Sequence, residues 1–129
     1  MGVTTSDMRV APRSPTPELS PINEPANFVK SEIKNRDIVI FSKSYCQYCH
    51  DTKQKVRRIK ENNPQMSIAV YELDKMGHEG REIQYTLLKT TGQKTVPNVF
   101  IAGQHIGGND RFQKLSMSKI QSLLDPVNL

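Results

Sequence analysis

The fold is decided by the stretch Ile38-Val39-Ile40-Phe41-Ser42-Lys43-Ser44-Tyr45-Cys46-Gln47-Tyr48-Cys49, which joins an apolar run to a pair of cysteines. The apolar run 38–41 predicts a buried strand, and the residues from Cys46 onward predict a helix. These are the only two cysteines of the chain. A dithiol where a strand passes into a helix predicts a thioredoxin-like redox site.

Length and composition indicate one small domain. The 129 residues, 36% of them hydrophobic, support a single modest core. No segment approaches the roughly 18 apolar residues that a membrane-spanning helix needs, and no apolar N-terminal run of the signal-peptide type is present. Two such closely spaced cysteines close too small a loop to brace a secreted scaffold. We therefore expect a protein of a reducing, cytoplasmic compartment.

The net charge is +5, and basic residues gather on the predicted helix after the cysteines. They are Lys53, Lys55, Arg57, Arg58 and Lys60. A solvated helix face and a surface that attracts anionic substrates both fit this pattern. A nucleic-acid surface would need aromatic side chains among the basic ones, which this helix lacks, so we expect no nucleic-acid partner.

Residues 1–21 form a tail of different composition, rich in proline, serine and threonine. Such a segment buries little apolar surface, which predicts disorder. The tail begins Met1-Gly2-Val3-Thr4-Thr5-Ser6, which fits the N-myristoylation pattern. Gly2 is therefore a candidate lipidation site, and we expect contact with a membrane only if Gly2 is acylated.

Apolar periodicity and turn signals divide the remaining residues, 22–129, into helices and strands. In order they are a helix through Ile22, Ala26, Val29 and Ile33, a strand at 38–42, a helix at 46–61, a strand at 67–73, a helix at 79–91, strands at 98–101 and 104–106, and a last helical region before Pro126. A β-α-β unit followed by a hairpin with flanking helices predicts an α/β fold, with a four-stranded mixed sheet covered by helices on both faces.

The helix pattern assigns unequal roles to the two cysteines. Positions three apart at a helix start face the same way, so the pair can form a disulfide with little backbone motion. Cys49 continues into an apolar stripe and points inward, whereas Cys46 sits at the exposed helix tip. Unpaired N–H groups and the helix dipole favour a thiolate there, and Lys43 adds a positive charge. Cys46 is therefore the expected nucleophile and Cys49 the resolving thiol.

Three other interpretations of the cysteine pair stay open at this point. A structural zinc site needs about four ligands, but His50, His78 and His105 lie on different predicted elements. A structural disulfide across so short a loop would constrain the chain little. The two cysteines could also meet in the core by chance. Redox chemistry explains their spacing and position best.

Three segments together resemble the signature segments of dithiol glutaredoxins. They are Lys43-Ser44-Tyr45-Cys46-Gln47-Tyr48-Cys49, Thr91-Gly92-Gln93-Lys94-Thr95-Val96-Pro97-Asn98-Val99-Phe100 and Ile106-Gly107-Gly108-Asn109-Asp110. The resemblance extends over about residues 27–125. It implies a thioredoxin-like fold, a glutaredoxin domain at 22–129, and a thiol–disulfide exchange that depends on glutathione.

The resemblance also implies a glutathione site. It makes Val96–Pro97 a cis peptide that faces the cysteines, where the backbone at Thr95 and Val96 pairs with the cysteinyl unit of glutathione. The other implied contacts are Lys43 and Gln84 on the glycine carboxylate, Tyr48 along the groove, and Gly108, Asn109 and Asp110 on the γ-glutamyl end. Simpler alternatives are a solvated Lys43, an exposed Gln84, surface packing of Tyr48, an edge-strand Pro97, and a plain turn and cap at Gly107-Gly108 and Asp110.

One position departs from the family pattern. Many dithiol members have proline where this chain has Gln47. Some relatives without that proline bind a 2Fe–2S cluster between two subunits, through the first cysteine and glutathione. The resemblance therefore implies a second hypothesis, a glutathione-ligated 2Fe–2S dimer in which Cys46 is the protein's metal ligand.

The first hypothesis is a monomeric glutathione-dependent oxidoreductase. Cys46 would take the glutathionyl group from a protein mixed disulfide, and Cys49 would resolve adducts with disulfide-bonded proteins. A second glutathione would restore Cys46, and glutathione reductase would recycle the glutathione disulfide. A thioredoxin-type reductant is less compatible with a chain that lacks tryptophan and carries the Gly107–Asp110 segment. A redox-inactive interaction module would leave the paired thiols unexplained.

Overall fold

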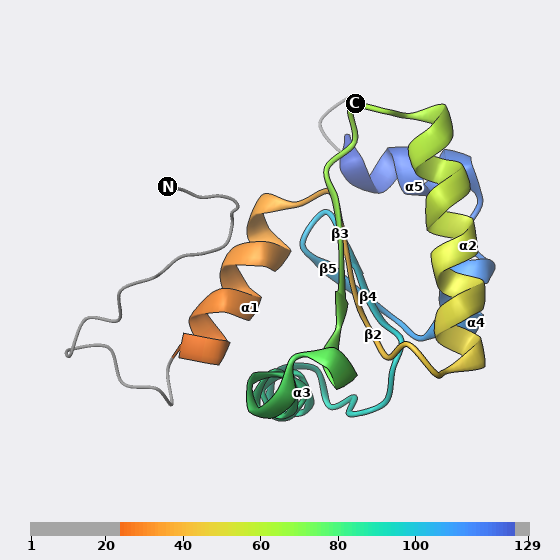
Figure 1. Ribbon diagram of the computed structural model, residues 1–129. Coiled ribbons are helices and arrows are strands. Elements are labelled where there is room, and N and C mark those ends of the chain that lie inside the picture. The colour runs from red at the N-terminus through yellow and green to blue at the C-terminus, as the bar shows by residue number, and fades with distance from the viewer. Residues whose placement is uncertain (1–23, 126–129) are drawn as a thin grey trace, which may run out of the picture.

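The computed structural model describes residues 24–125 (Figure 1). Its elements are α1 (Glu24–Asn35), β2 (Ile38–Ser42), α2 (Gln47–Asn62), β3 (Ile68–Glu72), the 3-10 turn η1 (Leu73–Lys75), α3 (Gly77–Thr91), β4 (Asn98–Ile101), β5 (Gln104–Gly107), α4 (Asn109–Gln113) and α5 (Met117–Leu124). The predicted tail 1–21, with Gly2, lies outside the described residues. None of the helices within residues 24–125 has the length and apolar character needed to cross a membrane.

The four strands form one mixed sheet in the order β3-β2-β4-β5. β2 runs parallel to β3 and antiparallel to β4, which is antiparallel to β5. All residues of the central strand β2 are buried, because helices cover both faces of the sheet, and this explains its continuous apolar run. Figure 1 shows α1 and α3 on one face and α2, α4 and α5 on the other. The predicted thioredoxin-like α/β fold is confirmed.

Successive side chains of the strands point to opposite faces of the sheet and pack into two cores, one on each face. The core under α2, α4 and α5 contains Ile38, Ile40, Val56, Ile59, Met66, Val99, Ile101, Phe112 and Ile120. The core under α1 and α3 contains Val29, Val39, Phe41, Leu73, Ile83, Leu87 and Phe100. Burying one large apolar side chain contributes about 1.5–3 kcal/mol. These cores therefore hold the sheet in place at the end of β2, which precedes the cysteines.

Several element boundaries differ from the sequence prediction by one or two residues, and the last helical region differs more. The helix after β2 begins at Gln47, with Cys46 as its N-cap residue. The predicted strand 67–73 ends at Glu72, because Leu73 already belongs to η1. The last helical region is two helices, since the hydroxyl of Ser116 accepts a hydrogen bond from Lys119 N and caps α5.

The basic residues of α2 are not simply a solvated face. Lys53 pairs with Glu72 of β3 at 2.6 Å. The ammonium of Lys55 donates to backbone carbonyls at the end of α4, the closest at 2.7 Å. Lys60 donates to two carbonyls in the loop that follows α2, both at 2.7 Å. The solvated-face interpretation therefore does not hold for the half-buried Lys53 and Lys55, whereas Lys60 is exposed. All three lysines tie α2 to neighbouring segments.

Candidate active site

The thiol of Cys46 lies at the N-terminus of α2. Cys46 is the N-cap residue with an extended backbone (φ −94°, ψ 126°), and its side chain makes no capping hydrogen bond. Its carbonyl accepts a hydrogen bond from His50 N at 3.0 Å. No side-chain cap therefore covers the first turn of α2. The sulfur that would attack a disulfide belongs to the residue that begins this helix.

Cys49 is the buried member of the pair. Its side chain points inward and is 0% exposed, as predicted, whereas Cys46 is half-buried rather than fully exposed. The Cys49 sulfur accepts a hydrogen bond from Lys43 N at 3.4 Å. Burial raises the pKa of the Cys49 thiol, and the Lys43 N–H and the Ser42 hydroxyl oppose that rise. Cys46 and Cys49 are both free thiols in this structure.

A carboxylate from η1 holds the loop that leads to Cys46. Asp74 accepts two hydrogen bonds from Ser44, one from its backbone N–H at 2.9 Å and one from its hydroxyl at 2.5 Å. These hydrogen bonds lower the pKa of Asp74. The turn η1 packs tightly on α3, because a Cβ on Gly80 would lie 2.0 Å from Leu73 O. The position of Asp74, and with it the loop, is therefore tied to α3.

The second segment of the site is the loop 92–97 between α3 and β4. Val96–Pro97 is a cis peptide bond, as the family resemblance implies. The Cys46 thiol is directed at Val96 O, 3.9 Å away. Val96 is half-buried and Pro97 is buried. The loop therefore presents backbone atoms, rather than a charged side chain, to the sulfur.

Two glutamine amides hold this loop in place. Gln93 Nε2 donates to Thr95 O and to Pro97 O, each at 3.0 Å. Gln84 Nε2, on α3, donates to Lys94 O at 2.7 Å. The resemblance assigns Gln84 to a glutathione carboxylate, but the structure shows it bound to the loop, with one amide hydrogen left for a ligand. Gln93 was not among the predicted site residues, although it lies inside the second signature segment.

Two glycines bring the end of β5 against the same loop. Gly107 has φ +116°, which favours glycine, and a Cβ there would lie 3.3 Å from Arg111 Cδ. Gly108 is the N-cap residue of α4, and its Cβ position is 3.7 Å from Pro97 O. The start of α4 therefore lies directly beside the cis peptide, and the three signature segments meet in space.

Asn109 is oriented by α2. Its Oδ1 accepts from the hydroxyl of the fully buried Thr52 at 2.8 Å and from Gln113 Nε2 at 2.9 Å. With the oxygen occupied, the amide nitrogen of Asn109 is the group left for a ligand. Asp110 is exposed and pairs with Lys114 along its own helix at 3.4 Å, an arrangement that is worth little energy in water. Thr52 was not among the predicted site residues.

The remaining predicted residues border the thiol. Lys43 is half-buried, and within residues 24–125 its ammonium takes part in no ion pair. Tyr48 lies in the first turn of α2 and is 65% exposed. Gln47 Nε2 donates to Asp51 Oδ1 at 3.1 Å, so its side chain lies along the helix. Thr95 is exposed in the loop beside Val96.

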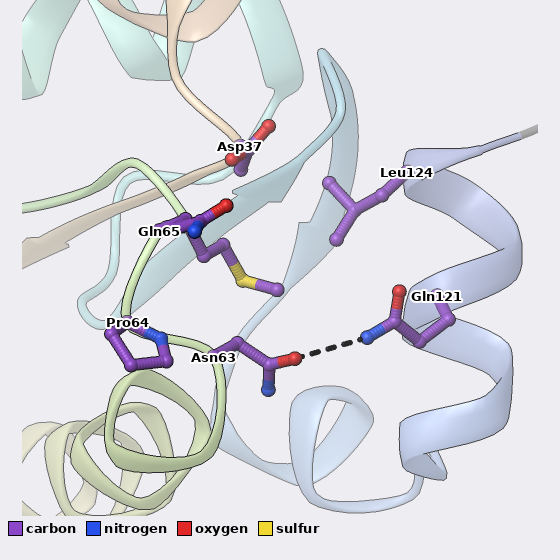
Figure 2. A pocket seen from close by; sticks show the side chains of 7 residues that line it. Asp37, Asn63, Pro64, Gln65, Gln121 and Leu124 are labelled. Carbon is purple, nitrogen blue, oxygen red and sulfur yellow. Dashed lines mark hydrogen bonds between the residues drawn. The ribbon is translucent and has the colours of Figure 1, made fainter.

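Residues 24–125 contain no cluster of metal ligands, and the hollow described below lies away from the cysteines. Within residues 24–125, no three His, Cys, Asp or Glu side chains gather as a metal site, so the zinc interpretation finds no ligand set there. A hollow of about 450 Å³, the distal pocket, is lined by Asp37, Asn63, Pro64, Gln65, Met66, Gln121 and Leu124 (Figure 2). It opens where β2 and β3 begin, at the opposite end of the sheet from Cys46, and its lining contains no thiol.

Comparison with known proteins shows the family to which the chain belongs. A glutaredoxin family model matches residues 38–106, which include both cysteines and the cis peptide. Glutaredoxin-1 of Saccharomyces cerevisiae is 39% identical over 105 residues, covering 81% of this chain and 94% of that protein. Glutaredoxin-C8 of Oryza sativa is 46% identical over 85 residues, covering 66% of this chain and 60% of that longer protein.

Solved structures show the same similarity. The buckwheat glutaredoxin–glutathione complex superimposes with a TM-score of 0.64 at 34% identity, covering 87% of this chain and 96% of that one. The holo form of glutaredoxin C1 from Populus tremula x tremuloides gives a TM-score of 0.65 at 35% identity, covering 79% and 96%. With the dithiol, the cis peptide and the α4 start together in one site, the chain belongs to the glutaredoxin family and is a thiol–disulfide oxidoreductase.

Proposed function

We propose that this protein reduces protein–glutathione mixed disulfides and protein disulfides, with glutathione as the electron donor. The observation that carries the proposal is the contrast between the two thiols. Cys46 is half-buried and directed at Val96 O beside the cis peptide, while Cys49 is fully buried behind it. A structural neighbour that is a glutaredoxin–glutathione complex supports glutathione as the co-substrate.

The monothiol part of the reaction uses Cys46 alone. Its thiolate attacks the glutathionyl sulfur of a mixed disulfide, so that a Cys46–glutathione bond forms and the bond to the substrate protein breaks. The substrate thiolate leaves with the electron pair and takes a proton from water. A second glutathione thiolate then attacks the glutathionyl sulfur, and glutathione disulfide forms as the Cys46 thiolate is restored.

Groups on both sides of Cys46 would hold glutathione. The backbone of Val96 would pair with its cysteinyl unit as an added strand. The free ammonium of Lys43 and the second amide hydrogen of Gln84 would bind the glycine carboxylate. At the start of α4, Gly108 and the Asn109 amide would bind the γ-glutamyl carboxylate, with Asp110 near its ammonium and Tyr48 along the groove.

A coupled assay tests this proposal. Turnover of a glutathionylated peptide is followed with glutathione and glutathione reductase, and in parallel with thioredoxin reductase as the only electron donor. We expect turnover with glutathione, and a Cys49→Ser variant that keeps most of it while losing the reduction of protein disulfides. Turnover that thioredoxin reductase supports and glutathione does not would contradict the proposal.

A glutathione-ligated 2Fe–2S dimer is the second candidate, favoured by the position of Gln47. Gln47 leaves a backbone N–H in the first turn that proline would lack, and its side chain donates to Asp51 at 3.1 Å along the helix. Because Cys49 is fully buried, each chain would offer Cys46 as its ligand to the cluster. A 2Fe–2S cluster would therefore need a second copy of the chain and two glutathione thiolates to complete its four sulfur ligands. Reconstitution with iron, sulfide and glutathione should give a coloured dimer, less of it for Gln47→Pro. A colourless monomer excludes it.

A further inference from the structure

Both acceptor positions of the Asn109 carboxamide oxygen are filled from within the protein. An amide oxygen has two lone pairs. The hydroxyl of Thr52, whose residue is 0% exposed, donates to Asn109 Oδ1 at 2.8 Å. Gln113 Nε2 donates to the same oxygen at 2.9 Å. The half-buried Asn109 side chain therefore offers a ligand only the two hydrogens of its Nδ2.

A backbone carbonyl of α2 determines which way both amides face. Gln113 Nε2 also donates to Asp51 O at 3.2 Å. A backbone carbonyl only accepts hydrogen bonds, so Gln113 turns its nitrogen, and not its oxygen, toward α2. The same nitrogen faces Asn109 and needs an oxygen there. Reversing the Asn109 carboxamide would bring two amide nitrogens together, so the polarity of Asn109 is fixed by α2.

A lysine fastens α4 to α2 one turn farther along. The ammonium of Lys55 donates to Phe112 O and to Leu115 O, each at 2.7 Å. It also lies 4.7 Å from the centre of the Phe112 ring, and Phe112 is fully buried in the core. Because α4 cannot slide along α2 without breaking these contacts, Thr52 stays within hydrogen-bond distance of Asn109.

The polarity of Asn109 matters for an amino-acid ligand such as the γ-glutamyl end of glutathione. That end carries a carboxylate, which only accepts hydrogen bonds, and an ammonium, which only donates them. A side chain that can only donate fits the carboxylate and is mismatched with the ammonium. Asp110, the next residue, is exposed and has the opposite polarity. A polar group that meets a mismatched partner discriminates between ligands strongly, because its hydrogen bonds to water are lost without replacement.

We propose that Thr52 and Gln113 are positioning residues that make this site selective for the γ-glutamyl carboxylate, an inference that rests on the glutathione-dependent function proposed above. Both act through Asn109 and neither needs to touch glutathione. Thr52 has the larger influence, because its hydroxyl is buried and water cannot replace the hydrogen bond that it donates. Gln113 is exposed, so water can partly replace its amide.

The test compares two mixed disulfides of one fluorescent peptide. The first carries glutathione, and the second carries cysteinylglycine, which lacks the γ-glutamyl unit. Excess reduced full-length protein is mixed with each, and stopped-flow fluorescence records cleavage of the mixed disulfide. The ratio of the two second-order rate constants measures selectivity for the γ-glutamyl unit, and circular dichroism establishes which variants are folded.

The variants separate the hydroxyl of Thr52 from the space that its side chain fills. Thr52→Val keeps the shape and removes the donor, whereas Thr52→Ser keeps the donor. Gln113→Leu removes the second donor. Thr86→Val is the matched control, since Thr86 is also a buried helical threonine, 7% exposed, but lies on α3, which covers the other face of the sheet (Figure 1).

Wild type should cleave the glutathione disulfide faster than the cysteinylglycine disulfide. Thr52→Val should lower this ratio about three- to tenfold, as expected for the loss of one hydrogen bond. The whole change should come from the glutathione disulfide, because cysteinylglycine has no γ-glutamyl carboxylate. Gln113→Leu should lower the ratio about twofold, within the range for one such bond. Thr52→Ser and Thr86→Val should keep the wild-type ratio.

A double-mutant cycle separates the orientation of Asn109 from a general loosening of α4. Asn109→Ala removes the carboxamide on which Thr52 acts, so adding Thr52→Val to it should not lower the ratio further. If Thr52→Val loosened α4 as a whole, it would still lower the ratio in the Asn109→Ala protein. The cycle thus measures an effect that a merely structural role of Thr52 would not produce.

Three results would overturn the inference alone: a folded Thr52→Val protein with the wild-type ratio, equal slowing of both disulfides, or a further fall of the ratio in the Asn109→Ala protein. If Thr52→Val does not fold, the exposed Gln113→Leu decides by the same criteria. Equal rates for the two disulfides in wild type would overturn the glutathione-dependent function as well. The failure of the positioning role and the failure of the function are therefore seen in different proteins.

Discussion

Both ends of the sheet use side chains to hold backbone in place, but only one end places thiols beside that backbone. At the redox end, which comprises Cys46, the loop 92–97 and the start of α4, side chains hold backbone in place. Gln93 bridges two carbonyls of the loop and Asp74 binds Ser44 twice. At the distal pocket, Asp37 Oδ2 accepts from Ser67 N at 2.8 Å, and Lys60 binds two carbonyls of the loop after α2. The hydrogen bond between Gln121 and Asn63, drawn across the hollow in Figure 2, is an exposed contact of 3.4 Å.

This comparison teaches that thiols beside held backbone mark the site, and that neither volume nor held backbone marks it alone. The distal pocket has a volume of about 450 Å³ but no nucleophile in its lining. The redox end uses its hydrogen bonds to set the positions of a sulfur, a carbonyl and a helix start before any ligand arrives, which is what precise binding and catalysis require. Substitutions at the redox end should therefore change turnover or KM, whereas substitutions at the distal pocket should leave both unchanged.

The largest effect is expected for Cys46→Ser. The variant lacks the sulfur that forms the first mixed disulfide, so turnover in the glutathione-coupled assay should fall by more than about 1,000-fold. The buried Cys49 should not replace it, because its side chain is 0% exposed. Mass spectrometry should find no glutathionylated variant after oxidised glutathione is added. Turnover near the wild-type rate would show that Cys46 is not the nucleophile.

The second effect is expected for Gln93→Ala. The substitution removes two hydrogen bonds to the loop, at Thr95 O and Pro97 O, and should lower the free energy of unfolding by about 1–2 kcal/mol. A looser loop should raise KM for the glutathionylated substrate several-fold while changing kcat less, because Cys46 itself is untouched. Urea denaturation and initial rates measure both. An unchanged KM would mean that the loop keeps its position without Gln93.

The sequence predicted the parts of this molecule that depend on periodicity. The buried run of β2, the mixed sheet and the inward position of Cys49 all follow from patterns that repeat along the chain. The split between α4 and α5 was missed, because the apolar residues continue across both helices and the cap at Ser116 is a single local contact.

The supporting residues of the site were missed for a different reason. Thr52 binds Asn109 across 57 positions of sequence, and Asp74 binds Ser44 across 30. A hydrogen bond between distant segments leaves no periodic trace in one sequence. The family resemblance drew attention to the residues expected to touch glutathione, whereas Gln93, Thr52 and Asp74 act by holding those residues in place.

A smaller, pH-dependent effect is expected for Asp74→Asn. Hydrogen bonds from Ser44 lower the pKa of Asp74 below 3.8 in the folded protein. The ionised carboxylate is therefore favoured by folding, and its contribution to stability is complete above pH 3.8 and is lost as pH falls through the folded pKa. Wild type should exceed Asp74→Asn in urea midpoint at neutral pH, and the gap should narrow in acid. A gap independent of pH would contradict the role of the charge.

The smallest effect is expected for Gln121→Ala in the distal pocket, which is the matched control for Gln93→Ala. Both variants remove a glutamine amide, but Gln121 loses one exposed contact of 3.4 Å with Asn63, so the free energy of unfolding should change by less than about 0.5 kcal/mol. KM and kcat in the glutathione-coupled assay should equal those of wild type. If Gln121→Ala raised KM as much as Gln93→Ala, the functional distinction between the redox end and the distal pocket would fail. An amide at either end of the sheet would then influence the thiol equally.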